Sequence, residues 1–230
     1  MNSNSIGRLY KPKLRISASL IAAPWLELNH TIKDLEYNGV EMLHFDIEDG
    51  HFTPYLSLGI KLISELRQFT DLVFDVHLMV DNPELFIGDL VKIGVDRIAL
   101  HWEATQYPLR TLNMIKNYNI KAGLAFNPAT QIPDLTYLFP YLDFVNLLST
   151  EPLTNNNKFI SSTINKLECG YKKYLKYDLE WVIDGGVTDE NILSIMGCHT
   201  DIVVIGRYLF EGSPREKIDQ LKKLIEEDHQ

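Results

Sequence analysis

Short apolar runs alternate with longer amphipathic segments along almost the whole chain. Most of the runs are continuously apolar, as residues 202–205 (IVVI) illustrate. Strands that are covered on both faces in a parallel sheet have this pattern. We therefore predict eight strands, at residues 15–22, 42–48, 72–80, 97–102, 121–126, 144–149, 180–184 and 201–206.

The segments between these runs carry apolar residues at spacings of three and four, which is typical of amphipathic helices. Residues 109–115 show the spacing clearly, and residues 215–227 combine one apolar stripe with charges on the remaining faces. Gly39, Gly94 and Gly197 follow three of the predicted helices, and glycine is a frequent helix stop. Regular alternation of strand and helix predicts right-handed crossovers and a parallel sheet.

Eight strand–helix units in a chain of 230 residues fit a closed barrel better than an open, doubly wound sheet. We predict an α/β protein with a single (β/α)8 TIM barrel, and barrels of this kind reach such a length as one domain. The domain is expected to extend over residues 1–230. One polar cluster, at residues 154–158, follows the sixth strand and would form a loop at the mouth of the barrel.

Composition and charge narrow the class of protein. The net charge of −9 argues against a nucleic-acid-binding surface, which usually carries a basic patch. Cys169 and Cys198 lack the spacing of a zinc ribbon or a disulfide framework. No apolar stretch is long enough to span a bilayer, and residues 1–8 lack the apolar core of a signal peptide. We expect a cytoplasmic enzyme that contacts neither nucleic acid nor membrane.

Four residues that can bind metal stand near the C-terminal ends of predicted strands: His44, Asp46, His77 and Asp184. Residues two apart on a strand point to the same side, so His44 and Asp46 face the same way. A single histidine at a strand end is more often an ordinary hydrogen-bonded residue than a ligand. Barrel enzymes have their active sites at the C-terminal ends of the strands. Four such residues at that end favour a binding site for one divalent ion: zinc, iron, manganese or cobalt.

The two carboxylates suggest a second role. Asp46 and Asp184 would approach the barrel axis from opposite sides. One could remove a proton from a carbon next to a carbonyl, and the other could return a proton to the opposite face. Inversion of configuration needs such an arrangement, because a single base returns the proton to the face from which it came.

Several motifs resemble, in order, the signatures of the ribulose-phosphate 3-epimerase family. They are Ser19, residues 44–54 (HFDIEDGHFTP), residues 75–80 (DVHLMV) with Asn82-Pro83, residues 127–130 (NPAT) and residues 184–187 (DGGV). The similarity extends from about residue 15 to about residue 210. Together these motifs indicate membership of that family.

The resemblance implies a metal-dependent epimerase of ketopentose phosphates, and a small-molecule sugar phosphate as its partner. It implies that His44, Asp46, His77 and Asp184 bind the metal, with Asp46 as proton acceptor and Asp184 as proton donor. Family members usually form oligomers, so we expect a homo-oligomer. The expected substrate-binding positions are Ser19, His77, Met79, Gly185, Gly186, Gly206 and Arg207.

The sequence departs from the family in the second strand, where Glu48 replaces a methionine; Leu148 replaces a second one, at the end of the sixth strand. A thioether would be a polarizable, uncharged wall beside the enediolate. A glutamate places negative charge where negative charge develops, which is unfavourable unless Glu48 points outward, is protonated, or binds a cationic group of the substrate.

The phosphate-binding elements differ further. The family has Asn-Pro-Gly-Phe-Gly-Gly-Gln after the sixth strand, whereas residues 151–157 here read EPLTNNN. The glycines that would let backbone amides close on a phosphate are missing, which leaves the role of Leu153, Thr154, Asn155 and Asn156 open. After the eighth strand, the family's Gly-Ser is Gly206-Arg207. Our hypothesis is that Arg207 replaces the lost loop as anion ligand; the alternative is a surface arginine that fixes the entry of the last helix.

Three functional interpretations remain. The first is an epimerase acting on D-ribulose 5-phosphate and D-xylulose 5-phosphate. The second is an epimerase acting on another sugar or sugar phosphate, such as a hexulose phosphate or a polysaccharide precursor, which the altered phosphate loop and Glu48 favour. The third is a barrel without catalytic activity, which the four retained residues disfavour. His101 and Glu103, at the end of the fourth strand, could line the pocket or pack in the core.

Overall fold

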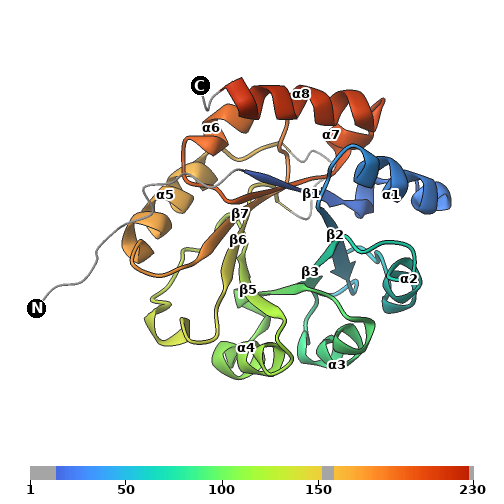
Figure 1. The fold of residues 1–230 in the computed structure, drawn as a ribbon. Coiled ribbons are helices and arrows are strands. Elements are labelled where there is room, and N and C mark those ends of the chain that lie inside the picture. Colours follow the sequence, from blue (N-terminus) through green and yellow to red (C-terminus); the bar gives the residue numbers. More distant parts are fainter. Residues whose placement is uncertain (1–13, 152–157, 228–230) are drawn as a thin grey trace, which may run out of the picture.

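The computed structural model describes residues 14–151 and 158–227. Its eight parallel strands close into one barrel in sequence order, with helices around the outside (Figure 1). The strands are β1 (Arg15–Ser19), β2 (Met42–Glu48), β3 (Val73–Met79), β4 (Arg97–His101), β5 (Lys121–Phe126), β6 (Phe144–Leu148), β7 (Glu180–Asp184) and β8 (Ile202–Ile205). The predicted (β/α)8 barrel is confirmed, and each strand lies within the apolar run that predicted it.

Side chains alternate strictly along the strands, as the geometry of a β-strand requires. In β2, Leu43, Phe45 and Ile47 belong to the core between strands and helices, and Met42 belongs to the core inside the barrel. The register pairs His44 with Asp75 of β3, and Asp46 with His77. The polar residues of neighbouring strands therefore lie in layers across the barrel interior.

Helices cover the barrel from outside (Figure 1). The α-helices are α1 (Leu28–Tyr37), α2 (Ile60–Leu66), α3 (Glu84–Ile93), α4 (Pro108–Lys116), α5 (Ser162–Tyr174), α6 (Ile192–Met196), α7 (Arg207–Phe210) and α8 (Pro214–Glu227). In α8 the predicted stripe is buried through Ile218, Leu221 and Ile225. Burial of each such side chain contributes roughly 1.5–3 kcal/mol.

The three predicted glycine stops do not all work in the same way. Gly39 and Gly94 adopt the left-handed conformation, with φ values of 72° and 80°. Gly197 follows α6 as predicted, but its φ of −58° is still helical. The left-handed residue of that turn is His199, with φ 63°, and its ring stacks on Tyr171 at 4.1 Å between centroids.

The crossover between β5 and β6 holds no α-helix, although residues 127–143 are all described. It contains only the 3-10 turn Thr136–Leu138. Pro128, Pro133 and Pro140 interrupt this segment, and proline removes a backbone donor and blocks helix continuation. The segment is held by Tyr174 of α5, whose hydroxyl donates to the Pro133 carbonyl at 2.9 Å.

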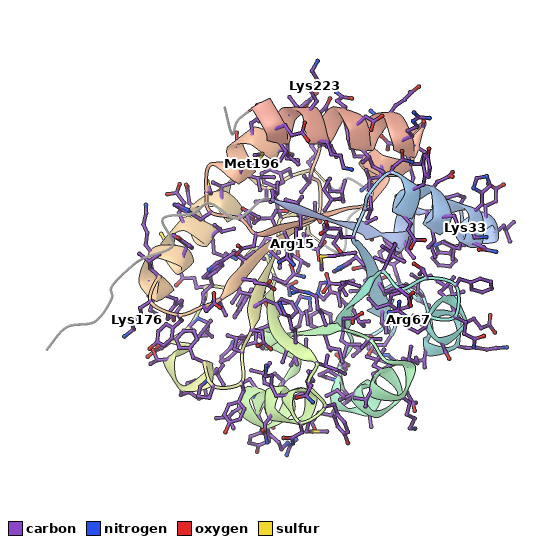
Figure 2. The ribbon with its side chains drawn as sticks, viewed as in Figure 1. Arg15, Lys33, Arg67, Lys176, Met196 and Lys223 are labelled. Carbon is purple, nitrogen blue, oxygen red and sulfur yellow. The ribbon has the colours of Figure 1, made fainter. Side chains whose placement is uncertain are left out.

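A charged layer lies at the N-terminal end of the barrel interior. Glu180 accepts from Arg15 at 2.7 Å and from Lys121 at 3.1 Å, and it also pairs with the buried Arg97. The Arg97 guanidinium lies 4.0 Å over the ring of Phe144. Figure 2 shows Arg15 inside the ring of strands, while Lys33 and Lys223 lie at the outer surface. This layer closes the barrel beneath the polar residues of the site.

Among the described residues, no helix is both long and apolar enough to cross a membrane. The barrel accounts for residues 14–151 and 158–227. The assignment of all of residues 1–230 to one domain stays a prediction.

Candidate metal centre and active site

Two imidazoles and two carboxylates converge inside the C-terminal end of the barrel. His44 and Asp46 come from β2, His77 from β3 and Asp184 from the last position of β7. One ligand atom from each lies within 4.8 Å of all the others, and all four residues are buried. The four residues therefore converge as the sequence predicted.

The imidazole nitrogens that face this point have no hydrogen-bond partner among the described residues, although both are buried. His44 Nε2 lies 3.3 Å from Asp46 Oδ1 and 3.4 Å from Asp184 Oδ2. His77 Nδ1 lies 3.5 Å from Asp46 Oδ1 and 3.2 Å from Asp184 Oδ2. Buried polar atoms are rarely left without a partner, and here four potential ligand atoms surround one point. The arrangement fits a divalent cation with nitrogen and oxygen ligands.

The electrostatics of the cluster favour positive charge at its centre. Burial alone would lower the pKa of His77, but the nearby carboxylates of Asp184 and Asp46 raise it to about 9. The same opposing effects raise the pKa of His44 well above its usual range. Burial would raise the pKa of Asp46 and Asp184, but the imidazoles hold both values well below normal. Protons on the imidazoles, or a cation in their place, balance the two carboxylates.

Each of the two carboxylates also accepts a hydrogen bond from a neutral side chain. The Ser19 hydroxyl donates to Asp46 Oδ2 at 2.7 Å, and Asn146 Nδ2 donates to Asp184 Oδ2 at 3.0 Å. Ser19 was predicted to lie at the site, whereas Asn146 was missed. A buried asparagine in an otherwise apolar strand was the available signal, because such a group requires a partner.

The two imidazoles are held from behind by different groups. Asp75 Oδ2 lies 2.9 Å from His44 Nδ1, and Arg97 in turn donates to Asp75 Oδ1 at 3.1 Å. His77 Nε2 instead lies 2.9 Å from His101 Nε2. His101 is fully buried, and burial is the main reason why its pKa falls to about 4. His101 therefore lies behind the site as a neutral imidazole.

A cavity of about 540 Å³ opens above the cluster. Asp46, His77 and Asp184 form part of its lining, while His44 lies beneath them. Every other residue predicted to bind substrate also lines this cavity: Ser19, Met79, Gly185, Gly186, Gly206 and Arg207. Leu153, Thr154, Asn155 and Asn156 lie outside the described residues.

The rim of the cavity at β6 and β7 is tightly packed. Gly185 and Gly186 have φ values of 105° and 67°, which side chains rarely adopt. A Cβ atom on Gly185 would collide with the Thr150 hydroxyl, and one on Gly186 would lie 3.0 Å from the backbone of Phe159. Ser149 holds the end of β6 against this glycine turn, since its hydroxyl donates to the carbonyls of Asp184 and Gly185 at 3.0 and 2.5 Å. Only glycine fits at these two positions.

Glu48 lines the cavity, which excludes the outward orientation considered from the sequence. Burial, and then the charge of Asp46, raise the pKa of its carboxyl group. Its Oε1 accepts a hydrogen bond from the Thr53 hydroxyl at 3.1 Å. On the β2 side, the cavity is therefore lined by the Glu48 carboxyl group, which is protonated more readily than an ordinary glutamate.

Three of the known proteins to which this chain is similar are ribulose-phosphate 3-epimerases. A ribulose-phosphate 3-epimerase from Bacillus subtilis is 33% identical over 89% of this chain and 95% of its own length. One from Buchnera aphidicola is 36% identical, covering 94% and 97%, and the chloroplastic enzyme of Arabidopsis thaliana is 32% identical, covering 90% and 75%.

Solved structures with low identity share the fold. The 3-keto-L-gulonate-6-phosphate decarboxylase of Vibrio cholerae aligns with a TM-score of 0.68 at 14% identity, covering 94% of this chain and 98% of that one. The tryptophan synthase alpha-subunit of Pyrococcus furiosus aligns with a TM-score of 0.62 at 16% identity, covering 94% and 96%. These two likenesses concern the barrel alone.

A sequence model of the ribulose-phosphate 3-epimerase family matches residues 15–210, the range over which the motifs resemble that family. Together with relatives above 30% identity that align over most of both chains, this match shows that the chain belongs to the ribulose-phosphate 3-epimerase family.

Proposed function

We propose that this protein is a metal-dependent epimerase that inverts the carbon next to the carbonyl of a ketose phosphate. The default substrate pair is D-ribulose 5-phosphate and D-xylulose 5-phosphate, by membership of the family. The observation that carries the proposal is the convergence of two buried carboxylates with two imidazoles on the floor of a cavity.

In this proposal Asp46 and Asp184 exchange protons with the two faces of the reacting carbon. Asp46 removes the proton from one face, and Asp184 delivers a proton to the other. Their positions on β2 and β7 support this division, since these strands are not neighbours in the barrel. The hydrogen bonds from Ser19 and Asn146 orient one carboxylate each. Fixed orientation matters, because proton transfer requires hydrogen-bond reach to the substrate.

His44, Asp46, His77 and Asp184 would hold one divalent metal ion. Imidazole and carboxylate ligands of this kind suit zinc, iron, manganese or cobalt. A bound divalent ion would stabilise the negative charge that develops on the substrate oxygens. The two unpartnered imidazole nitrogens support this assignment. The carboxylates remain responsible for proton transfer.

We assign substrate binding to residues that line the cavity. Ser19, His77 and Met79 would contact the sugar near the floor, and Gly185, Gly186 and Gly206 would contact the phosphate at the rim. Arg207 would bind the phosphate in place of the family's glycine-rich loop. Its support is that it lines the same cavity and that arginine binds phosphate through two parallel hydrogen bonds.

A second candidate is an epimerase that acts on another sugar or sugar phosphate. Glu48 favours it, because a carboxyl group in the cavity wall can hydrogen-bond a substrate hydroxyl that a methionine could not. Loss of the loop glycines in residues 151–157 favours it too. The reaction type would be unchanged, because both candidates use the same floor.

We further propose that the enzyme works in the cytoplasm as a homo-oligomer, without nucleic acid or membrane. The net charge of −9 supports the absence of nucleic acid. Exposed leucines support self-association: Leu26, Leu56 and Leu85, which follow β1, β2 and β3, are 102%, 80% and 77% exposed. Analytical ultracentrifugation tests the prediction, and a monomer at micromolar concentration would contradict it.

The function is tested by nuclear magnetic resonance in deuterated water with ribulose 5-phosphate and a panel of hexulose phosphates. The true substrate should take up deuterium at the carbon next to the carbonyl and equilibrate with its epimer. Metal analysis of the purified protein accompanies the assay. If no member of the panel exchanges, or if no divalent metal binds, the proposal is wrong. The ratio of kcat/KM values between the sugars decides between the two candidate substrates.

A further inference from the structure

The contact between His77 and His101 determines where the protons of both rings lie. His77 Nε2 and His101 Nε2 are 2.9 Å apart, so one of them must carry the hydrogen between them. The ring planes differ by 18° and the ring centroids are 4.9 Å apart, farther than the nitrogens. The rings therefore meet through their nitrogen edges rather than through their faces.

The direction of this hydrogen bond follows from the other nitrogen of His77. Nδ1 faces Asp46 and Asp184, and it can bind a metal only if it carries no proton. A neutral imidazole has one N–H, which His77 must then carry on Nε2. His77 Nε2 is the donor and His101 Nε2 the acceptor.

The same reasoning extends to Glu103. His101 accepts at Nε2, so its hydrogen is on Nδ1, which lies 3.0 Å from Glu103 Oε2. The other oxygen of Glu103 accepts from the backbone N–H of Asn127 at 2.9 Å. Both oxygens act as acceptors, which an ionised carboxylate can do and an amide cannot.

Lys166 fixes the far end of this chain of contacts. Its Nζ donates to the carbonyls of Asn127, Pro128 and Thr130 at 2.9, 2.6 and 2.8 Å. The loop after β5 is thereby tied to α5, and the Asn127 N–H is held against Glu103.

His101 is fully buried, and its ring packs against Phe52 at 4.5 Å between centroids. Water has no access to compete for the hydrogen bond.

We propose that His101 and Glu103 are positioning residues that fix the tautomer and orientation of His77, so that His77 Nδ1 faces the metal. The proposal rests on the proposed function only in taking His77 as a metal ligand. Ligating histidines commonly donate their second N–H to a fixed acceptor, and loss of that acceptor typically costs 10- to 100-fold in metal affinity. Here the acceptor is a neutral imidazole that is itself oriented by a carboxylate.

Three variants test the proposal through metal affinity, measured by competition of Zn²⁺ with a chromophoric chelator. His101→Leu removes the acceptor and should weaken Zn²⁺ binding about 10- to 100-fold. His101→Gln places a carbonyl oxygen near the lost nitrogen and should restore most of the affinity. Glu103→Gln leaves either Asn127 N–H or His101 Nδ1–H without an acceptor and should give an intermediate loss. His30→Leu, which changes an exposed histidine of α1, should bind Zn²⁺ like the wild type.

The wild-type protein gives a second test that needs no folded variant. Long-range ¹H–¹⁵N correlation spectra of the Zn²⁺-loaded protein should show His77 protonated at Nε2 and His101 protonated at Nδ1. The opposite tautomer of either ring would overturn the proposal, as would unchanged affinity in folded His101→Leu. Failure of the wild type to bind Zn²⁺, Mn²⁺ or Co²⁺ would also overturn it. Metal binding with the expected tautomers, but without epimerisation of any sugar tested, would refute the proposed function and leave this inference standing.

Discussion

The floor of the cavity and its rim along β6–β8 are built in different ways. On the floor, Asp46 and Asp184 each accept a hydrogen bond from a buried neutral side chain. At the rim, Arg207 is exposed, Thr150 occupies the space beside Gly185, and the sequence lacks the loop glycines of the family. Buried polar groups that orient one another tolerate little change, whereas an exposed rim can be rebuilt. The floor therefore predicts the reaction type, and the rim bears on which sugar enters.

Asp184→Asn gives the largest expected effect on the floor. Asparagine cannot deliver the proton to the second face, so epimerisation should slow by at least about 1,000-fold. Asp46 remains able to exchange the proton of the epimer whose reacting hydrogen faces it. Nuclear magnetic resonance in deuterated water should thus show residual exchange without inversion, in assays with excess metal to offset the lost ligand. Inversion at a near wild-type rate would show that Asp184 is not the second acid.

Arg207→Ala tests the rim and should change binding rather than chemistry. Loss of charge-assisted hydrogen bonds to a phosphate costs about 1.5–3 kcal/mol, so KM should rise about 10- to 100-fold while kcat changes little. Steady-state kinetics measure both values. Arg215→Ala, an exposed arginine of α8 outside the cavity, is the matched control. An unchanged KM would favour the alternative drawn from the sequence, a surface arginine that fixes the entry of the last helix.

Glu48→Met lies at the boundary between floor and rim and should have a smaller effect. If the substrate is ribulose 5-phosphate, removal of a carboxyl group beside the developing negative charge should raise kcat/KM roughly 3- to 10-fold. Glu48→Gln keeps the size of the side chain and should give part of the increase. A decrease in both variants would mean that Glu48 binds the substrate, and would favour the second candidate sugar.

The sequence predicted the four residues of the floor better than the groups that contact them, because strand alternation is local and contacts between distant segments are not. Alternation along a strand is local, so the spacing of His44 and Asp46 and the apolar run before Asp184 were enough to bring these residues together inside the barrel. The same alternation places Glu48 inside, which the sequence interpretation left open. Contacts between distant segments were not predictable: Asn146 meets Asp184 across 38 residues, and the orientation of His101 depends on the loop after β5.

Substitution of Glu180, in the charged layer beneath the floor, should have the smallest effect on catalysis but a clear effect on the stability of the fold. Burial would raise the pKa of Glu180, but Arg97 and Arg15 lower it to about 2. Because the folded-state pKa is depressed from 4.5, the stabilisation is complete above pH 4.5 and is lost as the pH falls from there toward about 2.

Glu180→Gln should therefore lower the free energy of unfolding at pH 7, by at most about 3 kcal/mol. The difference from the wild type should shrink as the pH falls from 5 to 3, because protonation of Glu180 removes the same charge. Urea unfolding across this range measures it, with Glu65→Gln, an exposed residue of α2, as control. The kcat/KM value should stay within about threefold, since Glu180 lies at the opposite end of its strand from Asp184. A pH-independent difference would mean that Glu180 stabilises the barrel by packing, and a large loss of kcat/KM would mean that the charged layer orients His44 through Arg97 and Asp75.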